Sequence, residues 1–365
     1  MAFESGSLSF RMFYVTRPLP ADAVARFAEM AAPSLEALTD GEIHGWVSGE
    51  HLLARVITEQ NAFYGGHLRL ALMKAQRKIP AEQFRAEVAM EVKALKEATG
   101  KAFLTRGERK DIKDAVTARL LPKMPPTIKG IPFVYDDRSN ILYAAAMSEK
   151  QADALSIYWA QTLGFNLVPV IPEVAALNRL RVNIKEWGPV SFSREAIDDE
   201  VGQDAGDDFL TWLWFFSEAR GGIVTVDYAQ YAVMIEGPLH FVGGGCGAQD
   251  VVLRKGEPRL SAEAKAALVD GKKLHRAKVT LAQGSDAYCF TFEASNFAVR
   301  GLKLPDPGKM DAVSLFQDRI NAVGRFADAL LGIYDQYVKE RNAVGMWSMT
   351  VDEMQAWVAE RKVRQ

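Results

Sequence analysis

Residues 105–123 have the sequence TRGERKDIKDAVTARLLPK, and this short segment contains six Lys or Arg residues. Thr105 followed three residues later by Glu108 is a capping-box pattern, in which the hydroxyl and the carboxylate each accept a free N–H at a helix start. Apolar residues recur through the segment at helical spacing, at Ile112, Ala115, Val116 and Leu120. The segment therefore predicts a capped amphipathic helix that ends near Pro122.

A second helix is predicted immediately before this one. Its apolar residues begin after Ala81 and follow helical spacing, at Phe84, Val88, Val92 and Leu95. Gly100 occupies the position just past the helix end, where a left-handed residue is favoured. The two segments together predict a helical hairpin.

The charge of the chain is strongly polarised around this hairpin. Residues 74–129 hold fourteen Lys or Arg and seven Asp or Glu, a local charge of +7 in a chain whose total is −2. Residues 195–208, EAIDDEVGQDAGDD, contain seven acids and no bases. The distribution of charge, rather than its sum, favours an anionic partner for the hairpin.

The predicted helix carries a stripe of cations on one face. Arg106, Arg109, Lys110 and Lys113 have the i, i+3, i+4, i+7 spacing that places side chains on one side of a helix. Such a patch attracts phosphates without distinguishing bases. The alternative is a solvated face in which nearby acids neutralise the cations. The candidate DNA-binding residues are Lys74, Arg77, Lys78, Lys101, Arg106, Arg109, Lys110, Lys113, Arg119, Lys123 and Lys129.

Strand and helix patterns alternate irregularly along the rest of the chain, which predicts an α+β fold with mixed sheets. Strands are predicted at 10–16, 131–137, 141–147 and 166–172, a strand that runs into a loop at 67–80, and helices at 22–30 and 148–164. Further strands are predicted at 222–229, 231–237, 239–244, 250–256, 278–284 and 288–294, with a short helix at 261–269. We expect five regions: an α+β part at 1–80, the basic hairpin at 81–130, a β-hairpin, helix and strand at 131–190, a mainly β part at 191–307, and C-terminal helices at 308–365.

Two apolar patterns have both a structural and a functional interpretation. The window FLTWLWFF at 209–216 could supply aromatic platforms for single-stranded nucleic acid, but its continuous hydrophobicity favours a buried strand or helix. A heptad-like seam is formed by Phe316, Ile320, Val323, Ala327, Leu330, Tyr334 and Tyr337. Packing of that helix on its own sheet explains the spacing better than an intermolecular coiled coil. A second C-terminal helix is predicted at 350–362.

Familiar catalytic and metal-binding motifs are missing from the sequence. GGGCG at 243–247 lacks a following GK[ST] and favours a hairpin turn. The five histidines, His44, His51, His67, His240 and His275, show no metal-ligand spacing. With Cys246 and Cys289 as the only cysteines, and no apolar run long enough for a membrane span, we expect a cytoplasmic protein without metal, cofactor or catalytic residues.

Two rival functions remain from the residues alone. The acids Asp198, Asp199, Glu200, Asp204, Asp207 and Asp208 could hold Mg²⁺ in a DNA nuclease, although a flexible acidic linker explains their density better. The C-terminal seam could instead make the chain a protein-interaction module.

The residues resemble the RdgC family of bacterial recombination-associated proteins. The similarity extends from ERKDIKDAVTARLLPK through PFVYDDRSNILYAAAMS to LGFNLVPV, with FRMFYVT and the segment from VRGLKLPD to LLGIYDQYV similar to the family's ends. The resemblance implies a non-enzymatic protein, found in the cytoplasm with the nucleoid, that binds duplex and possibly single-stranded DNA with little sequence preference. It further implies a ring-shaped homodimer that clamps DNA and restrains the RecA recombinase. The basic helix with Lys123 would then face the DNA.

Overall fold

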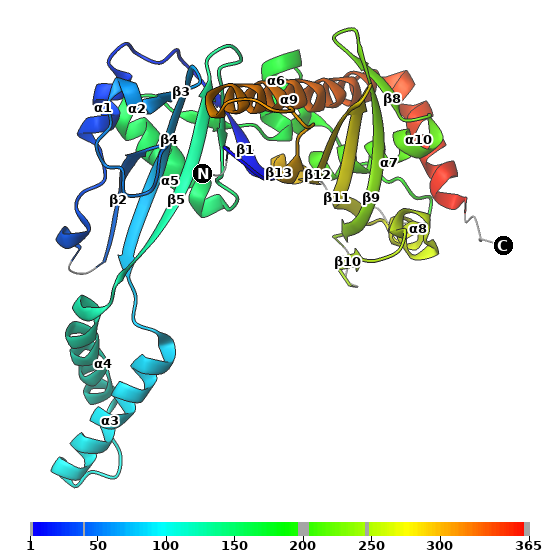
Figure 1. Cartoon of the computed structure of the whole chain (residues 1–365). Helices are drawn as coiled ribbons and strands as arrows, with labels where there is room; N and C mark the ends of the chain where they lie inside the picture. The colour runs from blue at the N-terminus through cyan, green and yellow to red at the C-terminus, as the bar shows by residue number, and fades with distance from the viewer. Residues whose placement is uncertain (1–2, 39–40, 196–203, 245–247, 361–365) are drawn as a thin grey trace. The chain divides into compact units, whose positions relative to one another are not determined.

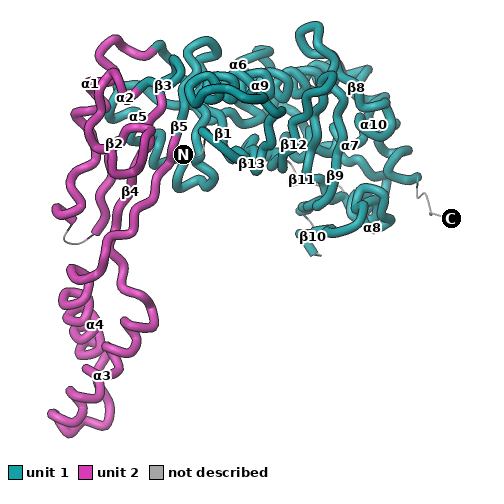
Figure 2. Tube along the Cα trace, viewed as in Figure 1, with its two compact units in different colours: residues 1–18, 63–68, 133–365 teal, residues 19–62, 69–132 magenta. Residues whose placement is uncertain are grey.

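The computed structural model describes residues 3–38, 41–195, 204–244 and 248–360 (Figure 1). The chain divides into two compact units, and each is described by itself (Figure 2). Unit 1 comprises residues 1–18, 63–68 and 133–365, and unit 2 comprises residues 19–62 and 69–132. The predicted hairpin therefore lies wholly within unit 2.

Unit 2 combines a small antiparallel sheet with helices. Its elements are α1 (Ala23–Glu29), η1 (Leu35–Ala37), β2 (Glu42–Ser48), α2 (Glu59–Ala62), most of β4 (His67–Arg77), α3 (Ala81–Thr99), α4 (Arg106–Leu120), η2 (Leu121–Lys123) and the first part of β5 (Pro126–Asp136). β2 pairs with β4 in a register that runs from Glu42 opposite Gln76 to Ser48 opposite Leu70. The strand predicted to begin at 67 and run into a loop by 80 is confirmed as β4, and the helices predicted at 22–30 and from 81 to Gly100 are confirmed as α1 and α3.

The core of unit 2 depends on close packing at β2. The rings of Phe27 and Trp46 meet edge to face with centroids 5.1 Å apart. Gly45 lies so close to the backbone of Ala32 that an added Cβ would come 2.4 Å from its Cα. Glycine is therefore required there for the chain after α1 to lie against the strand.

Unit 1 is built on a long sheet in the order β10-β9-β11-β12-β13-β1-β6-β5, with β8 beside β9, β7 beside β1, and β3 beside the first residues of β4. Its strands are β1 (Leu8–Val15), β3 (Phe63–Tyr64), β6 (Ile141–Ala144), β7 (Leu167–Pro169), β8 (Ile223–Val226), β9 (Ala229–Val242), β10 (Asp250–Leu253), β11 (Lys273–Gln283), β12 (Asp286–Glu293) and β13 (Ala298–Lys303). Every pairing recorded between these described strands is antiparallel. An α+β fold is confirmed, with antiparallel rather than mixed pairing of the described strands, because hairpins and meanders connect most neighbours.

The helices of unit 1 pack on the sheet through aromatic side chains. They are α5 (Glu149–Leu163), α6 (Pro172–Leu180), α7 (Ala205–Ala219), α8 (Ala262–Val269), α9 (Ala312–Asn342) and α10 (Val344–Ala359), with 3-10 turns η3 (Ile184–Glu186), η5 (Pro258–Leu260) and η6 (Ala294–Asn296). Phe209 of α7 contacts Phe292 of β12 at 6.3 Å between centroids, and Phe326 of α9 contacts Phe290 of the same strand at 4.7 Å. Both helices therefore cover one face of the sheet (Figure 1).

The two ambiguous apolar patterns are core elements. FLTWLWFF lies in α7, where Phe209 to Phe215 are buried, so the interpretation as a buried segment is confirmed and the segment is a helix. Every residue of the C-terminal seam is buried within α9, in the core of unit 1. The interaction-module hypothesis loses the observation that motivated it.

Three details of the prediction are wrong. The strands predicted at 231–237 and 239–244 form one strand, β9, because pairing with β11 continues on both sides of Pro238. The last helix, α10, begins at Val344 rather than at residue 350. The acidic segment was expected to be exposed, yet Asp207 and Asp208 are buried. Residues 245–247 of the predicted turn at 243–247 and residues 196–203 of the acidic segment at 195–208 lie outside the described residues.

Candidate nucleic-acid interface

The predicted capping box at the start of α4 is present. The Thr105 hydroxyl accepts a hydrogen bond from the Glu108 N–H at 3.2 Å, and the Thr105 N–H donates to the Glu108 carboxylate at 2.8 Å. The Lys101 ammonium donates to the other carboxylate oxygen at 2.5 Å. These donors, with Lys101 first, lower the pKa of Glu108 to about 2. The box fixes the start of α4 and the loop before it.

α3 and α4 lie side by side and form a helical hairpin within unit 2 (Figure 1). Val116 and Leu120 are the buried residues of α4, whereas α3 has no fully buried side chain. Arg119 of α4 bridges to two acids of α3, with distances of 2.9 Å to Glu87 and 3.1 Å to Glu91. The small apolar contact makes this hairpin a candidate for local opening.

The base of the hairpin is held by Arg77 at the end of β4. Its Nε donates to the Leu38 carbonyl at 2.8 Å, and its guanidinium also donates to the Met124 carbonyl just after α4. Arg77 therefore joins the two ends of the hairpin region to the sheet of unit 2. Its guanidinium is half-buried and has a structural role in this arrangement.

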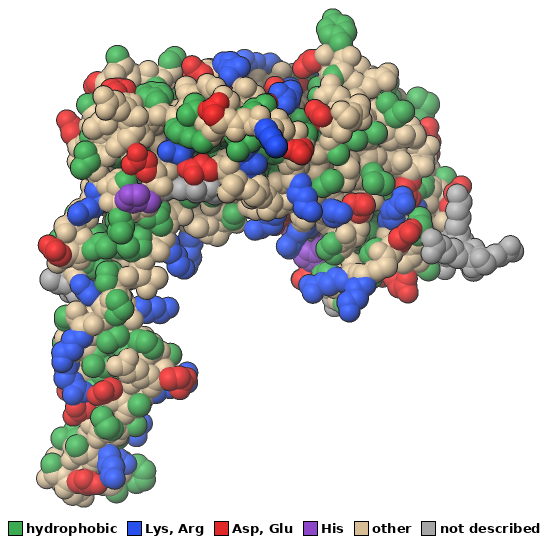
Figure 3. All heavy atoms as spheres, viewed as in Figure 1, with side chains coloured by type: hydrophobic (Ala, Val, Ile, Leu, Met, Phe, Trp, Pro, Cys, Tyr) green, Lys and Arg blue, Asp and Glu red, His purple; other side chains and the backbone are tan. Residues whose placement is uncertain are grey.

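The candidate cations separate into engaged and free groups. Engaged side chains bind acids or carbonyl oxygens of unit 2: Lys74 with Glu42, Arg77 with two carbonyls, Lys101 with Glu108, and Arg119 with two glutamates. Exposed side chains with no recorded hydrogen bond or ion pair among the described residues are Lys78, Arg106, Arg109, Lys110, Lys113, Lys123 and Lys129. The four-residue stripe predicted on α4 belongs entirely to the free group. Lys and Arg side chains are visible along the hairpin, with acidic side chains between them (Figure 3).

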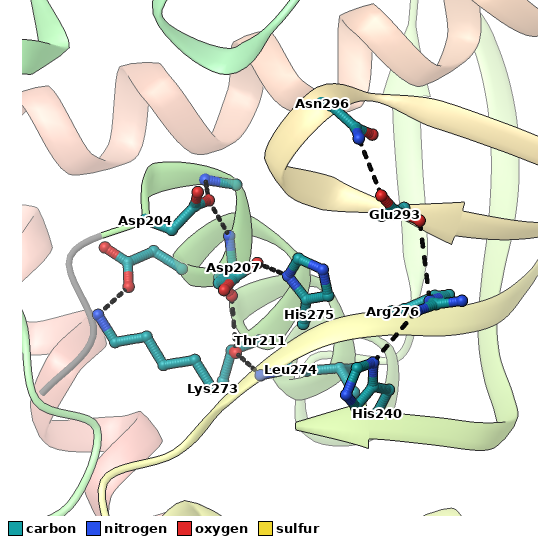
Figure 4. A network of polar contacts seen from close by, with 12 residues as sticks. Asp204, Asp207, Thr211, His240, Lys273, Leu274, His275, Arg276, Glu293 and Asn296 are labelled. Carbon is teal, nitrogen blue, oxygen red and sulfur yellow. Dashed lines mark hydrogen bonds and ion pairs between the residues drawn. The ribbon is translucent and has the colours of Figure 1, made fainter. Parts of the chain in front are cut away.

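A second group of charges lies around the start of α7 in unit 1 (Figure 4). Asp204 caps the helix, and its carboxylate accepts the N–H groups of Gly206 at 2.8 Å and Asp207 at 3.0 Å. Asp207 in turn bonds the His275 ring nitrogen at 2.9 Å. Burial raises the pKa of Asp207 to about 6, more than the histidine lowers it, and the bond to Asp207 raises the pKa of His275. The pair therefore retains a proton at a pH where a free Asp would be ionised.

Asp208 forms a buried ion cluster beside this pair. Its carboxylate binds the Arg341 guanidinium at 2.5 Å and also the Lys273 ammonium, and all three side chains are nearly inaccessible to solvent. Arg341 further donates to the Tyr337 hydroxyl at 2.6 Å and stacks 4.5 Å from the Trp187 ring centroid. Sequence patterns could not reveal this cluster, because Asp208 and Arg341 are separated by 133 residues.

These contacts bear on the predicted nuclease site. Asp204, Asp207 and Asp208 are occupied by a helix N-terminus, a histidine and two cations respectively. Asp198, Asp199 and Glu200 lie outside the described residues. Among the residues that are described, no group of three His, Cys, Asp or Glu side chains is arranged to hold a metal ion.

No helix in the described part of the chain is both long and apolar enough to cross a bilayer.

The fold and the free cations define an α+β protein with a helical hairpin suited to anionic ligands. Residues 15–181 match the model of a family described as "Putative exonuclease, RdgC". The match covers a little under half of the chain and confirms the resemblance of this part to the RdgC family. The match includes unit 2 and the hairpin and ends before α7. No curated protein matches the chain.

Proposed function

We propose that this protein binds DNA through its phosphates, with α4 as the principal contact and with little preference for sequence. The observation that supports this proposal is the free stripe of Arg106, Arg109, Lys110 and Lys113, exposed and without recorded partners among the described residues. Lys and Arg side chains that have no ion-pair partner in the folded protein remain able to neutralise phosphates and release their counterions. The match of residues 15–181 to the RdgC family model supports an association with DNA.

The finer proposal follows from the family resemblance. In it, two copies form a closed ring around duplex DNA, restrain RecA, and catalyse no reaction on the DNA. The protein needs no cofactor and acts at the nucleoid. The hairpin would supply phosphate contacts inside such a ring.

The first experiment reverses three cations of α4, in the variant Arg109→Glu, Lys110→Glu, Lys113→Glu. Binding to unrelated duplexes should weaken alike, and the salt slope should fall by about 3 if each side chain neutralises one phosphate. The matched control reverses three exposed cations of unit 1, Lys150, Arg254 and Lys309, which changes the net charge equally. Equal weakening in both variants, or none in the first, contradicts the assignment to α4.

The second experiment tests encirclement. The mass of the protein in solution should be that of two chains. A ring that has closed on DNA should stay on a covalently closed circle at high salt and leave a linear molecule by its ends. Equal dissociation from both forms argues against a closed ring and leaves phosphate binding intact.

A nuclease is the second candidate, because the matching family is described as a putative exonuclease. The acids nearest to such a role, Asp204, Asp207 and Asp208, are already engaged by protein groups. Labelled linear DNA incubated with Mg²⁺ separates the two functions. Protected, uncut DNA supports the clamp, whereas shortening that disappears in Asp198→Asn or Asp199→Asn supports the nuclease.

A further inference from the structure

Phe103 is an exposed aromatic residue in the loop between α3 and α4. Its side chain is 83% exposed, while the next residue, Leu104, is 7% exposed and anchors the loop. A phenyl ring left in water forfeits the gain that burial would give it. The two adjacent residues therefore differ: the Leu104 side chain is buried and the Phe103 side chain extends into solvent.

The loop that carries Phe103 is held on both sides. Lys101, two residues before it, and Thr105, two residues after it, both bond the carboxylate of Glu108. Gly100 ends α3 with a φ of 68°, which allows the chain to turn into the loop without strain. The ring is therefore presented by a constrained loop, which lowers the entropy lost when a ligand binds.

The surroundings of the ring are cationic. The Lys96 ammonium lies over one face of the ring, 5.7 Å from its centroid. Residues 93–113 carry seven Lys or Arg and three Asp or Glu. Two copies of this positive loop would repel each other, which disfavours a second copy as the occupant. A ligand with both negative charge and flat faces is complementary to it.

We propose that Phe103 stacks on an unpaired base of DNA while the cations beside it contact the adjoining phosphates. This inference rests on the proposed DNA binding by the hairpin and specifies its ligand. Every base offers a flat face, so stacking on an aromatic side chain is tolerant of sequence. In a duplex those faces are already covered by neighbouring bases, so the contact favours single-stranded segments, including those at ends and junctions.

The test compares the wild-type protein with Phe103→Ala, Phe103→Trp and the control Met90→Ala, which removes another exposed apolar side chain of the hairpin. Affinities are measured for a single-stranded oligonucleotide carrying one fluorescent aminopurine base and for a duplex of the same length. Phe103→Ala should weaken single-strand binding about tenfold, which corresponds to about 1.4 kcal/mol and lies within the range for one stacked base. Duplex affinity and its salt slope should not change.

The remaining variants separate the outcomes. Phe103→Trp should restore single-strand binding and the change in aminopurine fluorescence, and Met90→Ala should behave as the wild type. Unchanged single-strand affinity in Phe103→Ala, or an equal loss on both DNAs, overturns the proposal. A fall in the solution mass of Phe103→Ala to that of one chain also overturns it, because the ring would then contact a second copy. If the hairpin does not bind DNA at all, the result is different: the variant Arg109→Glu, Lys110→Glu, Lys113→Glu will bind duplex DNA with unchanged affinity.

Discussion

Two groups of cations in this protein have opposite environments. Arg109, Lys110 and Lys113 on α4 are exposed and have no recorded partner among the described residues. Lys273 and Arg341 in unit 1 are buried and share the carboxylate of Asp208. Removing a charge from water is costly unless an opposite charge compensates it, so the buried cations are committed to the fold. Those on α4 remain available to a ligand.

The difference in burial distinguishes cations that stabilise the fold from cations that can bind a ligand, which the amino-acid composition alone cannot do. A residue of the α4 stripe can be replaced with little effect on stability, because it gives up only contacts with water. Replacing Asp208 of the buried cluster would leave the two cations Lys273 and Arg341 without a compensating charge. Stability measurements should therefore respond to one group and DNA binding to the other.

The largest expected effect comes from breaking the buried cluster. Asp208→Asn removes the carboxylate that Lys273 and Arg341 share, and a buried charge left without its partner typically costs about 3–5 kcal/mol. The free energy of unfolding, measured with denaturant, should fall by about this amount. Asp111→Asn, the same change at an exposed residue of α4, should leave it within about 0.5 kcal/mol. Equal costs for the two variants would remove the distinction between the groups.

A smaller effect should appear as a dependence of stability on pH. Both Asp207 and His275 have raised pKa values in the folded protein, so the folded state binds protons more tightly than the unfolded one. The stabilisation is present at low pH and is lost as the pH rises from the ordinary Asp value of 3.8 through about 6 for Asp207, and further as His275 loses its proton above 6.5.

Denaturant titrations across this range should show the loss in the wild type, and Asp207→Asn should flatten the dependence. The expected size is about 2–3 kcal/mol, from roughly two pKa units at Asp207. A wild-type stability that rises between pH values of about 5 and 8 would show that the folded pair does not hold its proton.

The smallest effect concerns the start of α4. Thr105→Ala removes the hydroxyl that accepts the Glu108 N–H, and loss of an N-cap costs about 1 kcal/mol. Amide exchange in the first turn of α4 should accelerate, while Thr105→Ser should retain protection. Exchange in α9, a buried helix of unit 1, serves as the internal control. Unchanged exchange in α4 would mean that the bonds from Lys101 and from the backbone N–H of residue 105 to Glu108 are sufficient to hold the loop.

Local features of the fold were predictable because their causes lie within a few residues. The capping box needs only Thr105 and Glu108, and the glycines that end α3 and α5 have φ values of 68° and 80°, which few other residues adopt at low cost. The window at 209–216 was harder, because a continuous apolar run has no period to distinguish a strand from a helix. Its burial could be predicted, but its helical form could not.

The residues of the candidate site could be predicted from the sequence, but the contacts and the burial of their side chains could not. The spacing on α4 placed the stripe on one face, since helical geometry alone fixes which side chains are neighbours. It could not show that Arg77 holds the base of the hairpin through carbonyls of Leu38 and Met124, because these contacts join distant parts of the chain. The exposed position of Phe103 likewise depends on the burial of Leu104 beside it.

The sequence by itself determined the helical hairpin, its cap, its cation stripe and the resemblance to the RdgC family, because periodicity, capping and charge are properties of neighbouring residues. The tertiary structure alone decided which charges are free. Asp208 lies in an acidic segment that we expected to be a flexible linker. Its carboxylate nevertheless binds Lys273 and Arg341, which lie 65 and 133 residues further along the chain. Whether a charge is solvated or neutralised depends on what the fold packs around it, and that information is distributed over the whole chain.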